Sequence, residues 1–154
     1  MKLTSRGDYA TRIIMELSTV ERSYPVSVHE LAARTGISMK YLEQIMLRLR
    51  SAQIVRSERG AHGGYVLARR PEQLTIGEVI RPMDGPLAPS PCASQTAHVP
   101  CPAYRCPSEQ GCVLRGLWLD VRNAIAGVLD VTTFAELADR QRAVAGSTSG
   151  RYSI

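Results

Sequence analysis

Residues 27–67 read SVHELAARTGISMKYLEQIMLRLRSAQIVRSERGAHGGYVL, and this stretch decides the fold. It opens on a capping box, in which Ser27 and Glu30 stand three residues apart, and the helical pattern that follows stops at Gly36. A second helical pattern starts after Ser38 and keeps its apolar side chains on one face. Two short helices joined by a tight turn that contains glycine predict a helix-turn-helix, although the spacing alone also fits an ordinary helical hairpin.

The residues after these two helices favour the helix-turn-helix. Residues 54–55 predict a short strand, residues 65–67 predict another, and the loop SERGAHGG lies between them. A β-hairpin directly after a helix-turn-helix is a wing. The tip of this wing carries Arg56, Arg59 and His62 among three glycines, so we expect guanidinium groups and exposed backbone to enter a narrow minor groove together. A solvent-exposed position without a partner is the alternative for His62.

The second helix of the motif would present its outward side chains to DNA. Near its start, the end that approaches base edges in such motifs, these are Met39, Lys40, Glu43 and Gln44. Arg48 lies one turn further along and is included among the expected contacts. Glu43 would repel a phosphate, and it suits this face only if it accepts from a cytosine amino group.

Helical patterns also flank this motif. One spans about residues 5–18, and another follows a capping box at Thr75 and Glu78 and should end by Pro82. A long pattern covers residues 113–129, and Thr133 opens a last short helix.

The fold class expected from these elements is mainly α with a small β-hairpin wing. We predict a winged helix-turn-helix domain followed by a long C-terminal dimerisation helix. The expected segments are the winged domain at 1–82, a proline-rich cysteine loop at 83–112, the dimerisation helix and a short terminal helix at 113–143, and a flexible tail at 144–154.

The long helix carries an apolar seam over about two heptads. Its members alternate three and four residues apart: Leu114, Leu117, Val121, Ala124 and Val128. Such a seam packs either on its own domain or on a partner helix. Because the wing domain and one lone helix leave little else to cover it, we expect a homodimer.

The charge of the chain is unevenly distributed. Residues 1–82 hold 13 Lys and Arg against 8 Asp and Glu, whereas residues 83–154 hold 6 of each. The positive excess therefore lies in the winged domain, where it could meet phosphate, with a basic surface that has no partner as the alternative.

Composition limits the class of protein. No apolar run could span a bilayer, and the start MKLTSRGDYATRII has no apolar core of a signal peptide, so we expect a cytoplasmic protein without a membrane partner. No phosphate-binding glycine loop, paired-carboxylate site or Ser/His/Asp set is visible, and we expect no enzyme.

All four cysteines lie within 21 consecutive residues, as Cys92, Cys101, Cys106 and Cys112. Structural disulfides are rare in the cytoplasm, so this clustering indicates metal or redox chemistry. The spacing Cys-x8-Cys-x4-Cys-x5-Cys is wider than the paired knuckles of most zinc sites and suits an iron–sulfur cluster better. Zinc and a metal-free thiol switch are the alternatives.

Three stretches resemble one known family. They are MKLTSRGDYATRIIMELS at 1–18, GISMKYLEQIMLRLRSAQIVRSERGAHGGYVLARRPEQLTIGEVI at 36–80 and CVLRGLW at 112–118. They look like the bacterial winged-helix regulators that include IscR, NsrR and RirA, over roughly residues 1–143. This resemblance implies a homodimer on a pseudo-palindromic operator, with a cluster held between the winged domain and the dimerisation helix.

The resemblance also implies residue roles in DNA recognition. On the reading helix it implies Ser38, Lys40, Tyr41, Glu43 and Gln44. On the wing it implies Arg59 and the Gly63-Gly64 turn. In IscR-like members the glutamate that matches Glu43 helps to choose between operator classes.

For the cluster, family members use three cysteines and a fourth ligand of another type. Cys106 and Cys112 match the second and third cysteines, and Arg115 replaces the histidine ligand of IscR-like members. Asp8 stands where NsrR-like members have a ligating aspartate, which could reach the site from the partner subunit. Two ligand sets stay open: all four cysteines, or Cys92, Cys106 and Cys112 with Asp8. Asp8 could also simply cap the first helix together with Ser5.

The function expected from residues and resemblance together is a dimeric transcription regulator, in particular a repressor. Its operator binding would be gated by a 2Fe–2S or 4Fe–4S cluster that senses redox state, nitric oxide or iron supply. The alternatives are a metal-free regulator controlled by thiol oxidation or by a partner protein, and a zinc-stabilised DNA-binding protein.

Overall fold

The structure of this chain is a computed structural model that describes residues 2–20, 24–60, 63–102, 105–106 and 108–149. Its α-helices are α1 (Ser5–Thr19), α2 (Val28–Thr35), α3 (Met39–Ser51), α4 (Ile76–Asp84), α5 (Val113–Leu129) and α6 (Phe134–Ser149). The strands β1 (Val55–Glu58) and β2 (Gly64–Leu67) pair antiparallel. Two 3₁₀ turns complete the order, η1 (Pro71–Gln73) and η2 (Pro91–Ala93).

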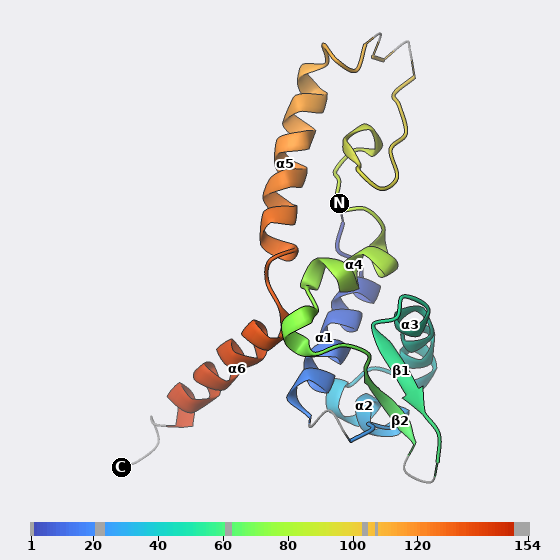
Figure 1. Ribbon diagram of the computed structural model, residues 1–154, viewed down its shortest axis with the longest axis vertical. Helices are drawn as coiled ribbons and strands as arrows, with labels where there is room; N and C mark the ends of the chain where they lie inside the picture. The colour runs from blue at the N-terminus through green and yellow to red at the C-terminus, as the bar shows by residue number, and fades with distance from the viewer. Residues whose placement is uncertain (1, 21–23, 61–62, 103–104, 107, 150–154) are drawn as a thin grey trace.

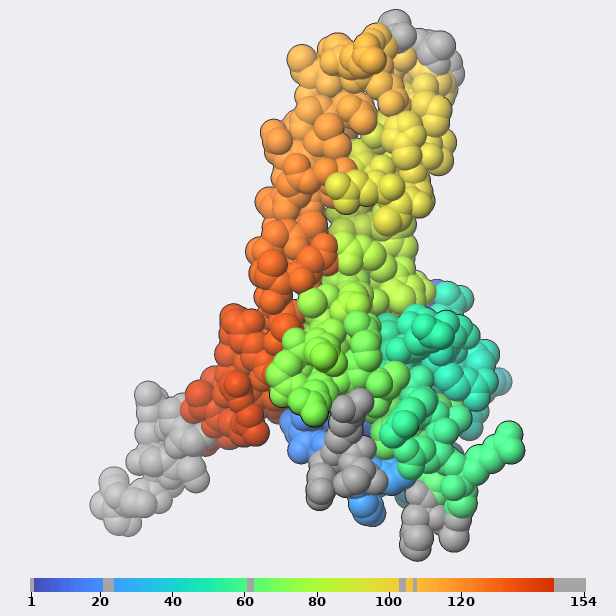
Figure 2. All heavy atoms as spheres, in the orientation of Figure 1, coloured from blue at the N-terminus to red at the C-terminus, as the bar shows by residue number. Residues whose placement is uncertain are grey.

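The elements divide into a body and an arm (Figure 1). Helices α1 to α4 and the β-hairpin gather into the body, and α5 extends away from it. The cysteine-bearing segment after α4 runs out along the arm and returns into the start of α5, so the arm has two sides (Figure 2). The expected mainly helical fold with a hairpin wing is confirmed. In the described part of the chain, no helix combines the length and the apolar character that crossing a membrane requires.

The helix-turn-helix forms for the local reasons that its sequence indicates. The hydroxyl oxygen of Ser27 accepts from the amide of Glu30 at 3.1 Å, and Gly36 ends α2 in the left-handed region with φ of 70°. The carboxylate of Glu30 pairs with Arg34 at 2.6 Å, so the contacts of this box are one-sided. Both halves of the predicted box at Thr75 and Glu78 are present at the start of α4.

Helix α3 is held in the body by its buried face. The residues expected to point inward are all buried: Leu42, Ile45, Met46 and Leu49. They pack in one core with the buried face of α1, namely Ala10, Ile13, Ile14 and Leu17. The exposed face of α3 is therefore fixed in orientation by the opposite face of the same helix.

The wing is longer and starts later than the sequence predicts. Its register pairs Val55 with Leu67 and Glu58 with Gly64, so residues assigned to the loop extend the first strand. The outer face of a two-stranded ribbon needs no apolar side chains, and here it carries an ion pair of 3.1 Å between Arg56 and Glu58. The alternation of apolar residues could not reveal this extension.

Gly64 is required where the wing meets the body. The backbone of Val26 bridges β2, with hydrogen bonds of 3.0 and 2.8 Å between Val26 and Tyr65. A β-carbon added to Gly64 would lie 2.4 Å from the carbonyl oxygen of Val26, well inside contact distance. Gly64 therefore allows the wing to pack closely against the backbone of Val26.

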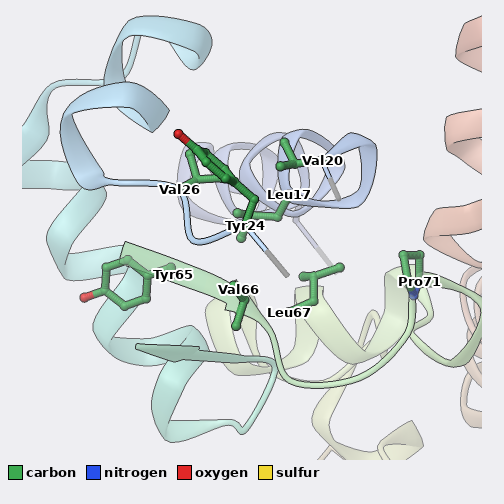
Figure 3. A pocket seen from close by; sticks show the side chains of 8 residues that line it. All are labelled: Leu17, Val20, Tyr24, Val26, Tyr65, Val66, Leu67 and Pro71. Atoms are coloured by element: carbon green, nitrogen blue, oxygen red, sulfur yellow. The ribbon is translucent and has the colours of Figure 1, made fainter. Parts of the chain in front are cut away.

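A small apolar hollow of about 70 Å³ lies beside this junction (Figure 3). It lies between the end of α1, residues 24–26, strand β2 and the start of η1. Leu17, Tyr24 and Leu67 are among the side chains around it, and all eight lining residues are apolar or aromatic. A hollow of this size, lined in this way, is suited to side-chain packing beneath the wing.

The predicted end of the fourth helix is wrong by two residues. Helix α4 runs through Pro82 and ends at Asp84, where Gly85 takes φ of 84°. A proline inside a helix removes one amide donor, the one that would bond the carbonyl of Glu78, while the following residues can still add to the helix. Here the amide of Gly85 bonds the carbonyl of Arg81 at 2.9 Å.

The last helix is long and starts inside the core of the body. Phe134 is fully buried, its amide bonds the carbonyl of Leu74 at 3.0 Å, and the amide of Ile76 bonds Thr132 at 3.1 Å. Burial of such a side chain contributes about 1.5–3 kcal/mol. The chain after α5 is therefore hydrogen-bonded back onto the body. The segments expected from the sequence did not include this contact.

Helix α6 also continues to Ser149, past the expected start of the tail at residue 144. Its sequence FAELADRQRAVAGSTS is rich in alanine, and Glu136 and Arg140 form an i,i+4 ion pair at 2.5 Å. Helix propensity and such pairs extend a helix without an apolar stripe, so periodicity gave no signal beyond the first turns.

Candidate nucleic-acid interface and cysteine cluster

The outward face of α3 is built as the sequence predicts. Met39 is 50% exposed, and the other side chains of this face, Lys40, Glu43, Gln44 and Arg48, are also exposed. Ser38 occupies the N-cap position without a side-chain cap hydrogen bond, so its hydroxyl is available to an outside partner. Together these residues form the α3 face: Ser38, Met39, Lys40, Glu43, Gln44 and Arg48.

Tyr41 does not belong to this outward set. It is half-buried, and its ring meets the ring of Tyr9 edge-on, with centroids 5.8 Å apart at 80°. Position 41 lies on the side of α3 that faces α1, because it stands one turn before buried Ile45. The structure thus gives Tyr41 a packing contact between the two helices.

The wing presents Arg59 to solvent. Arg59 is exposed, and its neighbour Arg56 is in the ion pair with Glu58. The amide of Gly63 bonds the carbonyl of Gly60 at 3.0 Å, and a β-carbon on Gly63 would lie 2.7 Å from the carbonyl oxygen of Glu58. Gly63 therefore closes the turn, while His62 lies outside the described residues.

Ion pairs divide the basic side chains of the body into two groups. Each of Arg12, Arg34, Arg56, Arg69 and Arg81 pairs with a carboxylate. Within the described residues of 1–82, the cations without a carboxylate partner are Lys2, Arg6, Lys40, Arg48, Arg50, Arg59 and Arg70. Lys40, Arg48 and Arg59 of this second group belong to the α3 face and the wing. Free positive charge on these surfaces suits an anionic partner.

The four cysteine thiols influence one another in two pairs. Cys92 is buried and pairs with Cys101, and Cys106 pairs with Cys112 at the start of α5. The hydrogen bond to Cys92 raises the pKa of the Cys101 thiol, and the hydrogen bond to Cys112 raises the pKa of Cys106. The charges of Cys112 and Glu109 also act on Cys101, so the two pairs face each other.

Cys112 differs from the other thiols because it occupies the N-cap position of α5, although its side chain makes no cap hydrogen bond there. The amide of Arg115 is the main cause that lowers the pKa of Cys112, followed by the hydrogen bond from Cys106. Amides at a helix N-terminus favour the thiolate, which is the form that binds metal. In the described part of the chain, no three His, Cys, Asp or Glu side chains are placed to hold one metal ion.

Two arginines of α5 fix the backbone of the first cysteine, and the sequence gave no sign of this. The Nε of Arg115 donates to the carbonyl of Cys92 at 3.1 Å, and Nη1 of Arg122 donates to the carbonyl of Ala93 at 3.0 Å. Arg115 is the residue that replaces the histidine ligand of IscR-like proteins. Here it positions the loop that carries Cys92.

Asp8 lies in the first turn of α1, with its carboxylate 2.9 Å from Nε of Arg12. No contact between Asp8 and a thiol occurs in the described part of this single chain. The amide and hydroxyl of Thr4, which caps α1, both donate to the carboxylate of Asp84, with the amide at 2.9 Å. The end of α4, where the cysteine segment departs, is thereby tied to the start of α1.

The expected dimerisation seam of α5 is uncovered in the single chain. No residue of α5 is buried, and Leu114, Leu117 and Val128 are 59%, 50% and 61% exposed. Ala124 is also exposed and Val121 is half-exposed. A groove of about 560 Å³ next to the seam is lined by Leu3 from the N-terminal segment and by four residues of α5.

Comparison with known proteins gives a consistent result. Residues 3–140 match the model of the Rrf2 family, described as an iron-dependent transcriptional regulator. The chain is 36% identical over 137 residues to the protein rrf2 of Nitratidesulfovibrio vulgaris Hildenborough, which covers 89% of this chain and 87% of that protein.

Two solved structures have the same fold. The structure of CymR, described as the global cysteine regulator of B. subtilis, superposes with a TM-score of 0.70 at 35% identity and covers 91% of this chain and 98% of that one. The structure of T. potens IscR superposes with a TM-score of 0.66 at 27% identity and covers 100% of this chain and 93% of that one.

Proposed function

This chain belongs to the Rrf2 family of transcriptional regulators, and from that premise we propose that it is a cytoplasmic, dimeric repressor whose operator binding is gated by an iron–sulfur cluster on the cysteine loop. The winged fold and the family make it a DNA-binding regulator, and relatives such as CymR and IscR are named as transcriptional regulators and not as enzymes. The cluster, the dimer, the individual contacts and the repression are the proposed part.

The observation that supports DNA binding is the position of the cations that have no carboxylate partner. Lys40 and Arg48 on the α3 face, and Arg59 on the wing, are exposed and free of carboxylate partners in the described residues. Five other arginines of the body are paired with carboxylates within the chain. A surface that leaves its cations unpaired at the two elements that read DNA in winged helices supports binding to phosphate and groove.

Arg59 offers a direct test of the wing. We expect Arg59→Ala to weaken operator binding by about 1–3 kcal/mol, because a guanidinium in a groove makes directional, charge-assisted bonds. Fluorescence anisotropy titration of a labelled operator duplex measures this change. Arg56→Ala is the matched control, since Arg56 is already paired with Glu58, and we expect a clearly smaller loss. Equal affinity of the Arg59 variant and the unchanged protein would remove the wing contact.

The cysteine loop fits an iron–sulfur cluster in its donor chemistry. Four thiols in one segment match the all-cysteine donor set of common clusters, and the lowered pKa of Cys112 favours a thiolate at the helix start. Cys92, Cys106 and Cys112 would hold the cluster, with Cys101 or the partner subunit's Asp8 as the fourth ligand. When bound, such a group supplies one-electron chemistry and reactivity toward oxygen and nitric oxide.

The contacts of the chain supply a route from this loop to the reading helix. Arg115 and Arg122 hold the loop backbone on α5, and Asp84 at the other end of the segment holds Thr4 at the start of α1. Helix α1 in turn contacts α3 through Tyr9 and Tyr41. A change in the cysteine loop can therefore reorient α3 through packed elements, which supports gating.

Metal content tests the cluster proposal. Protein purified without oxygen should carry iron and acid-labile sulfide in matching amounts and should absorb broadly in the visible range. One zinc per chain without colour would make the metal structural. Protein that stays free of metal after reconstitution would favour the second candidate, a thiol switch, which the mutual influence of the thiols on their pKa values supports.

A further inference from the structure

A small polar cavity lies between α1 and α3, at the edge of the α3 face. The cavity measures about 90 Å³ and is lined by Arg6, Tyr41, Gln44, Ile45 and Arg48. Arg6 is the second residue of α1, and the other four lie on α3. Figure 1 shows these two helices side by side in the body.

The charges around this cavity point to an anion. Arg6 is half-buried and Arg48 is exposed, and neither has a carboxylate partner among the described residues. No acidic side chain lines the cavity. Asp8 in the first turn of α1 pairs with Arg12 at 2.9 Å, and Asp84 accepts from the amide and hydroxyl of Thr4. Two guanidinium groups that face one polar space without a counter-charge are stabilised by an anion with several acceptor oxygens.

The floor and walls of the cavity are rigid. Ile45 is buried at 1% exposure, and the ring of Tyr41 is held edge-on against Tyr9. Arg48 and Gln44 stand one turn apart on the same side of α3, so both side chains start from the wall of the cavity. Such a site does not have to be assembled when the anion arrives.

The position of Gln44 decides which anion fits. Gln44 belongs both to this cavity and to the exposed α3 face, so an anion bound here lies at the edge of the surface expected to meet the groove. We propose that Arg6 and Arg48 together seat one backbone phosphate of the DNA that α3 reads, and that Arg6 of α1 is a DNA-contacting residue. This inference rests on the proposed DNA recognition and adds to it a residue outside the helix-turn-helix and the wing.

A phosphate contact carries no sequence information, so a mixed-sequence duplex is a sufficient probe. We expect Arg6→Gln to weaken binding to this duplex about tenfold and to reduce the slope of log affinity against log salt by about 0.9, the value for one phosphate. Arg6→Lys should retain most of the affinity, since an ammonium group also binds phosphate. Arg140→Gln on α6 is the control with the same charge change, and it should leave both quantities unchanged.

The outcomes separate this inference from the proposed function. If the unchanged protein does not bind the duplex, the DNA-binding proposal fails and the inference fails with it. If the unchanged protein binds and Arg6→Gln binds with the same affinity and salt slope, only the proposed phosphate contact of Arg6 is overturned. A loss of affinity with an unchanged slope would also overturn it, because the role of Arg6 would then be structural. Arg6-dependent thermal stabilisation by inorganic phosphate, without loss of duplex affinity, would assign the cavity to a free anion instead.

Discussion

Protein in which Cys112 is replaced by serine should contain no stoichiometric iron. Cys112 is the thiol at the start of α5, where the amide of Arg115 lowers its pKa and so favours the thiolate that binds iron. A serine hydroxyl is far weaker as an iron ligand and cannot accept this role. Iron, acid-labile sulfide and the visible spectrum, measured on protein purified and reconstituted without oxygen, should all fall to background.

The control for this variant is Ser108→Ala in the same loop. Cys106 bonds the backbone carbonyl of Ser108 at 3.3 Å, so removal of the Ser108 hydroxyl leaves this contact in place. The Ser108 variant should retain iron and sulfide. Full iron content in Cys112→Ser would exclude Cys112 from the ligand set and would contradict the proposed site.

The same assay distinguishes the two ligand sets. If all four cysteines bind, Cys101→Ser should lose iron and Asp8→Ala should retain it. If Asp8 of the partner subunit completes the site, the result should reverse. Asp8 pairs with Arg12 on an exposed helix surface, where an ion pair contributes at most about 1 kcal/mol, so Asp8→Ala is not expected to unfold the chain.

The second large effect is expected at the centre of the α5 seam. Leu117→Glu should convert the proposed dimer into a monomer. It should also weaken operator binding more than 100-fold, roughly 3 kcal/mol or more, because one dimer would no longer bind both half-sites at once. Leu117 is 50% exposed in the single chain, so the charge is tolerated in the monomer but would be buried in a partner interface. Sedimentation velocity and an operator titration measure the two changes.

Asn123→Asp is the matched control for this variant. It adds one negative charge to the same helix on the side away from the seam, and it keeps the oxygen to which Arg122 donates. It should remain dimeric. A Leu117→Glu protein that also sediments as a dimer would mean that another surface, and not the α5 seam, joins the subunits. Circular dichroism of both variants confirms that the helices are intact.

The sequence predicted the parts of this fold that follow from short-range rules. The apolar spacing of Leu42 and Leu49 located the buried face of α3, and the left-handed Gly36 marked the end of α2. Both signals arise within a few residues of chain. The same rules misjudged Pro82, because a proline costs one hydrogen bond and the packing of α4 on α1 compensates for it.

The parts that were missed depend on contacts between distant residues. Arg122 reaches a carbonyl 29 positions earlier in the chain, and Arg81 and Asp130 form a two-bond ion pair at 2.7 Å across 49 positions. An arginine on a helix surface looks the same in sequence whether it faces solvent or a loop carbonyl. Tyr41 shows the same limit, since only the position of Tyr9 on another helix makes it a packing residue.

The burial of Phe134 also has a consequence for how the protein is made. A chain leaves the ribosome from its N-terminus at about 5–20 residues per second. The core under α1 and α4 lacks its aromatic side chain until residue 134 of 154 has emerged, so the winged body cannot finish folding as an early, independent unit. The winged body therefore reaches its final packing only once nearly the whole polypeptide has been synthesised, because its largest fully buried side chain comes from the last helix.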